Sequence, residues 1–155
     1  MIESSVTKLV RLVRGMSLRC RTGIILLPVR YTGREREVAA RIELDAVDYA
    51  EEILRGALPG TFYLDINAEA DERRLDALIR DTDGGDALLV YNFDIALARM
   101  DPQDRFYLWH SIKDRLAYGR KALLIAIPQG AIKLLPPEKD LAVWMSDSRI
   151  AHYGA

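Results

Sequence analysis

Three short, continuously apolar segments do most to limit the fold of this chain. They are Gly23–Val29, Ala87–Tyr91 and Lys121–Ile127, and polar or turn-forming residues bound each of them. A strand that is buried on both faces has this pattern, because neither side of its pleat meets water. Each segment is far too short to cross a bilayer as a helix, which takes about 20 apolar residues. We therefore predict three central strands of a sheet that is covered on both faces.

Helical patterns alternate with these strands. Ser4 or Ser5 is a suitable N-cap for a helix in which apolar residues recur at helical spacing. Asp101 and Pro102 are typical of an N-cap followed by the first helical position. Within the second long helical segment, Asp45 is expected to start a further helix. The predicted helices cover 5–16, 35–56, 71–80, 95–100 and the segment after Pro102.

Two further segments complete the predicted sheet. Residues 61–66 are rich in strand-forming side chains, and 149–153 alternate as an edge strand does. Alternation of strands and helices predicts an α/β three-layer sandwich with a mostly parallel sheet of four or five strands. A length of 155 residues is about one domain's worth. We expect a single domain, with an amphipathic helix over 1–16 and an α/β core over 23–155.

The composition places the chain among folded cytoplasmic proteins. Half of its residues are hydrophobic and 29% are charged, which is enough apolar surface for a core. We expect neither a secretory leader nor a membrane contact. A single cysteine, Cys20, excludes a disulfide scaffold and a cysteine-rich zinc site, and it suits a reducing compartment. Although Arg19 and Arg21 flank this thiol, no histidine lies near it in the sequence, so we expect it to be inert.

The net charge of −1 results from cancellation between two parts of the chain. Residues 1–41 hold nine Lys or Arg against three acids, whereas the rest holds 13 against 20. The basic part suggests phosphate contacts with DNA, docking of an acidic protein or of a second copy, or only the polar face of an amphipathic helix. The candidate binding residues are Lys8, Arg11, Arg14, Arg19 and Arg21.

The loop after the first strand partly matches a phosphate-binding loop. Parallel sheets bind ligands beyond the carboxyl ends of their strands, and there Gly33 opens a helix with Arg34 in the place of the motif's lysine. Pro28 replaces the first glycine, and Glu35 replaces the Ser or Thr that meets magnesium. A loop wrapped around an open nest of amides would favour phosphate binding, and a turn filled by Tyr31 or Arg34 would favour degeneration.

The ends of the other central strands carry the remaining candidates. In a P-loop protein, an acid that holds magnesium is expected directly after the strand predicted over 87–91. Here Tyr91 or Asn92 stands in that place, and Asp94 comes two or three residues late. Asn92 and Asp94 also suit the cap of the next short helix. Gln129 ends the last central strand, where a polar residue either senses a terminal phosphate or is only a polar group at a strand end.

With its elements in this order, the chain resembles small P-loop NTPases of the additional-strand, AAA-like kind. Its C-terminal part is similar to the small P-loop protein family of bacterial phage-exclusion (BREX) defence systems: a strand from Leu88, the Asn92-Phe93-Asp94 element, a helix begun by Asp101-Pro102, an apolar strand and the His152-Tyr153 ending. The resemblance covers residues 20–153. It implies a P-loop-like fold, a phosphate loop at Gly33 and Arg34, a second motif at Asn92 and Asp94, and ATP with Mg²⁺ as ligands.

These observations predict a non-catalytic or weakly nucleotide-binding P-loop-like component of a cytoplasmic bacterial assembly, in anti-phage defence. We expect a protein partner or a second copy, and neither a catalytic residue nor a metal site. One alternative is a divergent NTPase in which Arg34 replaces the lysine and Asp94 recruits Mg²⁺. Another is a DNA-binding accessory module that uses the basic N-terminal segment. The vestigial phosphate-site residues are Gly33, Arg34, Asn92, Asp94 and Gln129.

Overall fold

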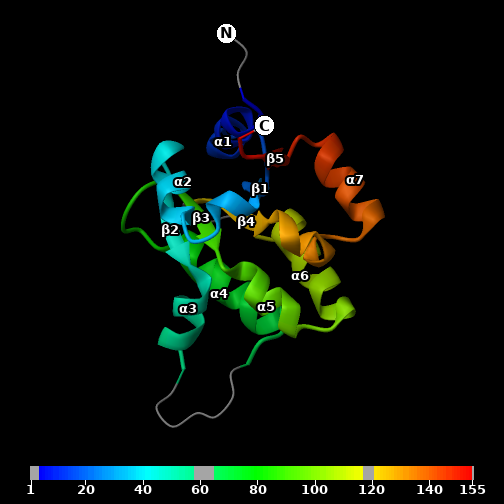
Figure 1. The fold of residues 1–155 in the computed structure, drawn as a ribbon. Coiled ribbons are helices and arrows are strands. Elements are labelled where there is room, and N and C mark those ends of the chain that lie inside the picture. The colour runs from blue at the N-terminus through cyan, green and yellow to red at the C-terminus, as the bar shows by residue number, and fades with distance from the viewer. Residues whose placement is uncertain (1–3, 58–64, 117–120, 155) are drawn as a thin grey trace.

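The computed structural model describes residues 4–57, 65–116 and 121–154, and its centre is one sheet of five parallel strands (Figure 1). The strand order is β2-β3-β4-β1-β5, and every neighbouring pair runs parallel. The predicted α/β class and the three buried central strands are therefore confirmed. The strands are β1 (Thr22–Leu27), β2 (Asp45–Asp48), β3 (Ala87–Tyr91), β4 (Ala122–Pro128) and β5 (Ile150–His152).

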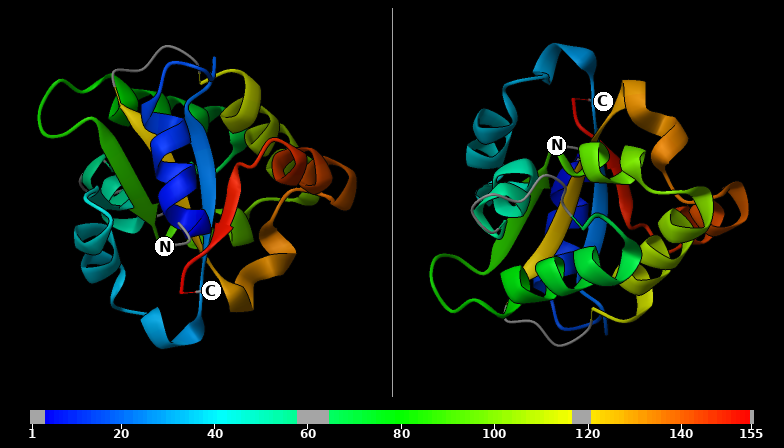
Figure 2. Two further views of the ribbon diagram at one scale, coloured as in Figure 1. Left: turned by 90° about the horizontal axis from the view of Figure 1, so that it is seen from above. Right: turned by 90° about the horizontal axis from the view of Figure 1, so that it is seen from below.

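Helices cover both faces of this sheet, and Figure 2 shows α1 across one face and α4, α5 and α6 across the other. The two buried hydrophobic clusters agree with this arrangement. Residues of α1 and α2 belong to one cluster, and residues of α3, α5, α6 and α7 belong to the other. The helices are α1 (Ser5–Arg14), α2 (Glu35–Arg41), α3 (Tyr49–Arg55), α4 (Ala68–Arg80), α5 (Phe93–Arg99), α6 (Pro102–Asp114) and α7 (Glu138–Ser146), with 3₁₀ turns η1 (Val29–Tyr31) and η2 (Gln129–Leu134).

Local sequence explains where the well-predicted helices begin. The hydroxyl of Ser4 accepts the amide of Thr7 at 3.1 Å and caps α1. The carboxylate of Asp101 accepts the amide of Asp104 at 2.8 Å, with Pro102 in the first turn of α6. Each side-chain oxygen satisfies an amide that has no partner within its helix.

The segment 35–56 corrects one prediction. Asp45 does not start a helix; it starts the edge strand β2, which pairs with β3. The next helix, α3, begins after Asp48, whose carboxylate accepts the amide of Ala50 at 3.0 Å. Glu43, at φ 59°, ends the preceding helix in a left-handed conformation. Of the strand predicted over 61–66, residues 61–64 lie outside the described part, and residues 65 and 66 belong to no strand.

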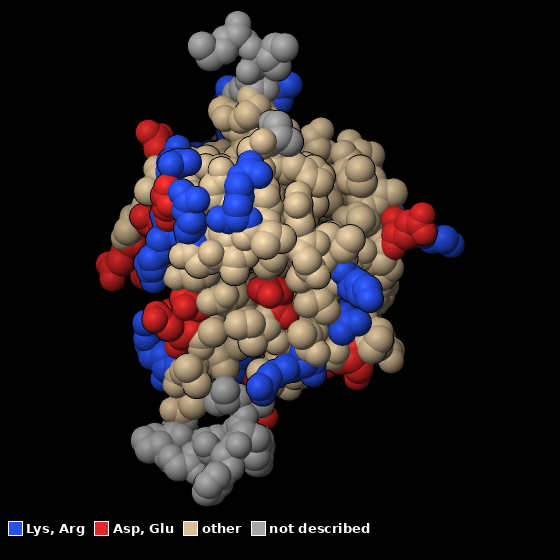
Figure 3. Space-filling view, viewed as in Figure 1, with Lys and Arg blue, Asp and Glu red and all other residues tan. Residues whose placement is uncertain are grey.

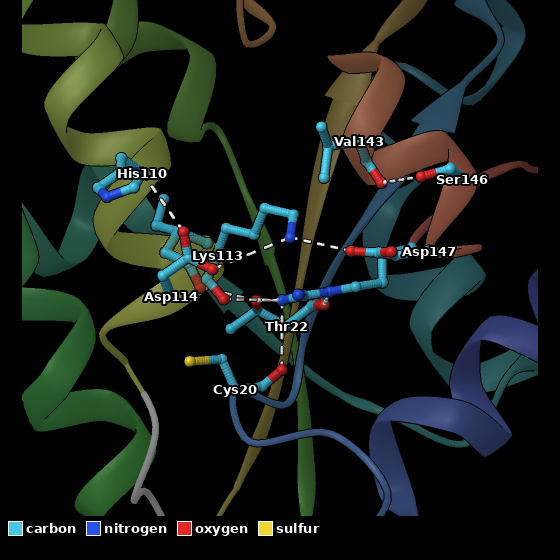
Figure 4. Close-up of polar contacts among 10 residues, drawn as sticks. Cys20, Thr22, His110, Lys113, Asp114, Val143, Ser146 and Asp147 are labelled. Atoms are coloured by element: carbon cyan, nitrogen blue, oxygen red, sulfur yellow. Dashed lines mark hydrogen bonds and ion pairs between the residues drawn. The ribbon is translucent and has the colours of Figure 1, made fainter. Parts of the chain in front are cut away.

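A buried arginine fastens the last strand to the amino end of the sheet (Figure 4). Arg149 is 4% exposed, and its guanidinium donates to the carbonyl of Thr22 at 2.9 Å and to the carbonyls of Cys20 and Lys113, both at 3.2 Å. It also donates to the hydroxyl of Thr22, and its guanidinium lies 4.8 Å from the ring centroid of Trp144. This cluster ties α6, α7 and β5 to the start of β1. It therefore lies at the end of the sheet opposite the carboxyl ends of the strands.

Candidate functional site

A small cavity lies at the point of the sheet from which successive connections run toward opposite edges. After β1 the chain crosses by α2 on one face, and after β4 it crosses by α7 on the other, so a crevice opens beyond the carboxyl ends of these strands. The cavity has a volume of about 120 Å³. Its lining combines strand ends with the starts of α2 and α5: Leu27, Thr32, Glu35, Tyr91, Asn92, Asp94, Ile95, Ala126 and Pro128.

Four successive amides of the loop after β1, those of residues 31–34, are engaged within the chain. Those of Tyr31, Thr32 and Arg34 donate to backbone carbonyls at 2.9–3.0 Å. The amide of Gly33, at φ 81°, donates to Oε1 of Glu35 at 2.6 Å. A phosphate nest needs successive amides that converge on an empty space. Here a carboxylate oxygen of the chain itself takes the amide of the motif's glycine.

The side chains of the same loop pack against one another and against Tyr153. Tyr31 packs edge-on against Tyr153, with ring centroids 4.8 Å apart, and the guanidinium groups of Arg30 and Arg34 lie 5.0 and 5.4 Å from the Tyr31 ring centroid. Arg34 also forms two hydrogen bonds with Glu37, at 2.8 and 2.9 Å. The pKa of Arg34 is raised by its hydrogen bond to Glu37. Arg34 therefore serves local packing rather than standing free as the lysine of a phosphate loop does.

Charged side chains of both signs gather over η1 and α2 in the space-filling view (Figure 3). The basic residues of these elements are Arg30, Arg36 and Arg41. The carboxylates of Glu35 and Glu37 stand among them in the first turn of α2. The surface beside the cavity is thus a mixture of ion pairs rather than a uniform positive field.

Asn92 connects two strand ends instead of pointing a free amide at a ligand. Its backbone is left-handed, with φ 62°, and its Nδ2 donates to Oδ1 of Asp48 at 2.9 Å. The same carboxylate oxygen caps α3. Asn92 precedes α5 but makes no side-chain capping bond there, so the predicted cap role is wrong for this residue.

Asp94 is the acid of the cavity whose surroundings most resemble those of a catalytic carboxyl group. It is half-buried in the cavity lining, and burial raises the pKa of its carboxyl, with Glu35 adding to the rise. Tyr91 closes the end of β3, and burial likewise raises the pKa of its phenol. The Arg36 guanidinium lies 5.7 Å from the Tyr91 ring centroid. A tyrosine ring therefore occupies the end of the strand on which a P-loop motif would carry its acid.

The structure brings together only some of the predicted site residues. Asn92 and Asp94 line the cavity, whereas Gly33, Arg34 and Gln129 do not belong to its lining, and Gln129 is exposed. Sequence reasoning missed Thr32, whose hydroxyl-bearing side chain lines the same cavity. Its place just before Gly33 was the available clue, because residues next to a loop glycine often face the ligand space.

Of the two carboxylates in the cavity lining, those of Glu35 and Asp94, one is already engaged within the chain, which leaves an incomplete donor set for a magnesium ion. Mg²⁺ takes oxygen ligands in near-octahedral geometry, usually one or two carboxylates and waters. The Glu35 carboxylate is bound to Gly33, and an apolar-faced Tyr91 holds the position of the strand-end acid. Among the described residues, no group of three or more His, Cys, Asp or Glu side chains could hold a metal ion.

The five candidate basic residues of the N-terminal segment lie partly on α1 and partly in the connection that follows it. Lys8 and Arg11 are exposed on α1, while Arg14 is drawn inward, donating to Oδ1 of Asp86 at 3.2 Å and to the carbonyl of Glu43. Arg19 and Arg21 lie in the connection from α1 to β1. Next to them, Cys20 is buried, and this burial raises the pKa of its thiol, consistent with an inert side chain.

Comparison with known proteins adds no relative. No family model, no curated protein and no solved structure matches this chain. The described helices include none with the length and apolar character needed to cross a bilayer.

Proposed function

We propose that this chain is a non-catalytic, P-loop-like binding component of a cytoplasmic bacterial assembly. The observation that carries this proposal is the hydrogen bond from the Gly33 amide to the Glu35 carboxylate, because it fills the anion position of the loop from within the chain. The position of β4 between β1 and β3 supports the additional-strand resemblance. The role in anti-phage defence rests on the similarity of the segment from Leu88 to Tyr153 alone.

The size of the cavity argues against a bound nucleotide in this conformation of the loop. Small-molecule sites usually measure about 300–1,000 Å³, and this cavity measures about 120 Å³. A nucleotide needs the loop to open, which breaks the Gly33–Glu35 hydrogen bond and displaces Tyr31 from Tyr153.

Calorimetric titration with ATP and with ADP, each with and without Mg²⁺, tests the proposal. We expect no saturable binding below about 1 mM, which corresponds to about −4 kcal/mol, and no release of inorganic phosphate. Binding at micromolar concentration together with turnover would refute a non-catalytic role.

One observation favours the alternative of a divergent NTPase. Asp94, with its raised pKa, lines the cavity together with Thr32, and perturbed acids gather at active sites. That alternative predicts ATP turnover that Asp94→Asn abolishes and that Asp104→Asn, on α6 outside the cavity, leaves unchanged. A preparation that releases no phosphate contradicts it directly.

The DNA-binding alternative draws on the exposed Lys8 and Arg11 of α1. It predicts binding of duplex DNA that weakens steeply with salt, because phosphate contacts release counterions. Arg11→Glu should then abolish binding, whereas Arg73→Glu, exposed on α4, should not. A salt-independent interaction, or equal binding by both variants, excludes this alternative.

A further inference from the structure

A groove between α1 and the end of α2 shares no lining residue with the strand-end cavity. Its volume is about 380 Å³. One wall is a single face of α1, since positions 7, 10, 11 and 14 follow the spacing that stacks side chains on neighbouring turns. The other wall is the chain at the end of α2. The lining residues are Thr7, Val10, Arg11, Arg14, Arg41, Ile42 and Glu43.

The lining combines an apolar surface with a positive rim. Val10 and Ile42 supply the apolar part, and the guanidinium groups of Arg11, Arg14 and Arg41 supply three positive charges. Glu43 is the one acid among the lining residues. Such a groove accepts an apolar side chain and, beside it, negatively charged groups.

The two walls are tied together before any partner arrives. Arg14 donates to the carbonyl of Glu43 and so links α1 to the end of α2. At this end of α2, the amide of Glu43 donates to the carbonyl of Ala40 at 3.2 Å. The amide of Leu44 donates to the carbonyl of Ala39 at 2.9 Å. A groove that exists in the free protein spares a partner the cost of ordering it.

Two arginines of the rim, Arg14 and Arg41, already hold carboxylates of this chain. Arg41 donates to Glu37 at 2.8 Å, and Arg14 donates to Asp86 at 3.2 Å. A guanidinium has five N–H donors, so one such bond leaves further donors for a second acceptor. Carboxylates are well matched to the remaining donors, because they accept them in pairs.

A phosphodiester strand fits this groove less well than a peptide. It carries charge at every step and so meets the carboxylates of Glu37, Glu43 and Asp86 that stand between the arginines. It also brings no aliphatic side chain for Val10 and Ile42. A peptide supplies a few separate carboxylates together with an apolar anchor.

We infer that this groove binds an acidic segment of a partner protein, in which an apolar side chain packs onto the groove-facing surface of Val10 and Ile42 while flanking Asp or Glu residues pair with Arg11 and Arg41. The inference rests on the proposed role as a binding component and names the chemistry of the partner. It does not depend on the state of the strand-end cavity.

Nuclear magnetic resonance titration of ¹⁵N-labelled protein tests the inference. The probe is a synthetic acetylated hexapeptide, Glu-Asp-Leu-Glu-Asp-Leu amide, and its control carries Gln and Asn in place of the acids. We expect the acidic peptide to shift the amide signals of α1 and of Ile42 and Glu43, with affinity about tenfold higher than that of the control. Equal affinity of both peptides, or shifts that lie elsewhere, overturns the inference.

Paired variants locate the binding charge. Arg11→Gln combined with Arg41→Gln should weaken peptide binding about tenfold, whereas Arg73→Gln, on the exposed surface of α4, should not change it. Unfolding by urea checks that each variant folds. Tighter binding of an oligothymidine strand by the same residues, or a dimer that the double variant dissociates, overturns the inference in favour of nucleic acid or a second copy. Micromolar ATP binding together with turnover by the unmodified protein, with the peptide shifts retained, refutes only the non-catalytic role.

Discussion

The Oε1 atom of Glu35 lies 2.6 Å from the backbone nitrogen of Gly33 and accepts its hydrogen. In a working phosphate loop a ligand oxygen takes such a place, at a helix start where the dipole favours negative charge. The chain thus supplies its own anion to the loop. This internal bond orders the turn and, at the same time, competes with any phosphate.

Removal of this carboxylate should cost stability. We expect Glu35→Ala to lower the free energy of unfolding by about 1 kcal/mol, because both the hydrogen bond to the Gly33 amide and a favourable charge at the start of α2 are lost. Glu35→Gln keeps an acceptor oxygen and should lose less. Urea denaturation at neutral pH measures both. Glu138→Ala, at an exposed position in the first turn of α7, reports the charge effect alone; if Glu35→Ala loses no more than this variant, the bond to Gly33 contributes nothing.

Asn92 offers a test of how the strand ends are held. Alanine there loses the bond to Asp48 and keeps the left-handed backbone, so we expect a loss of about 2 kcal/mol. Glycine loses the bond but adopts this backbone freely, so Asn92→Gly should be less destabilised than Asn92→Ala. Thermal unfolding compares the two. The reverse order would show that the left-handed backbone conformation does not dominate at this position.

The buried strands were predictable, whereas the edge strand β2 was not. Continuous apolar runs such as Leu123–Ile127 permit few structures, because both faces must be covered. In β2, Ala46 and Val47 are only half-buried and lie between acids, so their pattern merges with that of the helices on either side. No glycine or proline marks the break at Glu43, where an uncommon positive φ ends α2.

The place of the candidate site was predictable, but the engagement of its groups was not. Parallel topology directs attention to the loops that contain Gly33 and Asn92. The bond from Asn92 to Asp48 joins residues on strands whose pairing was not predicted, so no sequence spacing announces it. The contact of Glu35 with Gly33 spans only two residues. It depends on a side-chain rotamer that the sequence pattern does not fix.

Arg149 should be among the most sensitive positions of the chain. Within the described residues no carboxylate lies at ion-pair distance from it, and its charge is held by carbonyls of Cys20, Thr22 and Lys113. Burial lowers the pKa of its guanidinium. We expect Arg149→Met to cost about 3 kcal/mol, because several buried carbonyls lose their donor.

Arg149→Lys should recover only part of that loss, since one ammonium cannot reproduce the planar fork of donors. Urea denaturation followed by tryptophan fluorescence suits this position, because Trp144 stacks on the guanidinium. Arg73→Met, on the exposed surface of α4, is the matched control and should change stability by less than about 0.5 kcal/mol. Equal stability of the Arg149→Met and Arg73→Met variants would show that the buried cluster contributes nothing.

A buried carboxyl between α3 and α4 should make stability depend on pH. Asp71 is fully buried, and its Oδ1 accepts hydrogen bonds from Tyr49 Oη at 2.6 Å and from Arg74 at 2.7 Å. Among the residues that the structure describes, none forms a hydrogen bond with its Oδ2. Burial raises the pKa of this carboxyl, although Tyr49 and Arg74 act in the opposite direction.

Between the unfolded-state pKa of about 3.9 and the higher folded-state pKa, the folded protein binds more protons at Asp71 than the unfolded chain does. The Asp71 contribution to stability is therefore fully present at lower pH and falls as pH rises through this interval. Asp71→Asn should remove this slope. Tyr49→Phe should steepen it, because a donor to the charged form is lost. Unfolding by urea from pH 3 to pH 8, taken as the difference between parent and variant, isolates the contribution of Asp71. A difference that stays constant over this range means that Asp71 has the same pKa in both states.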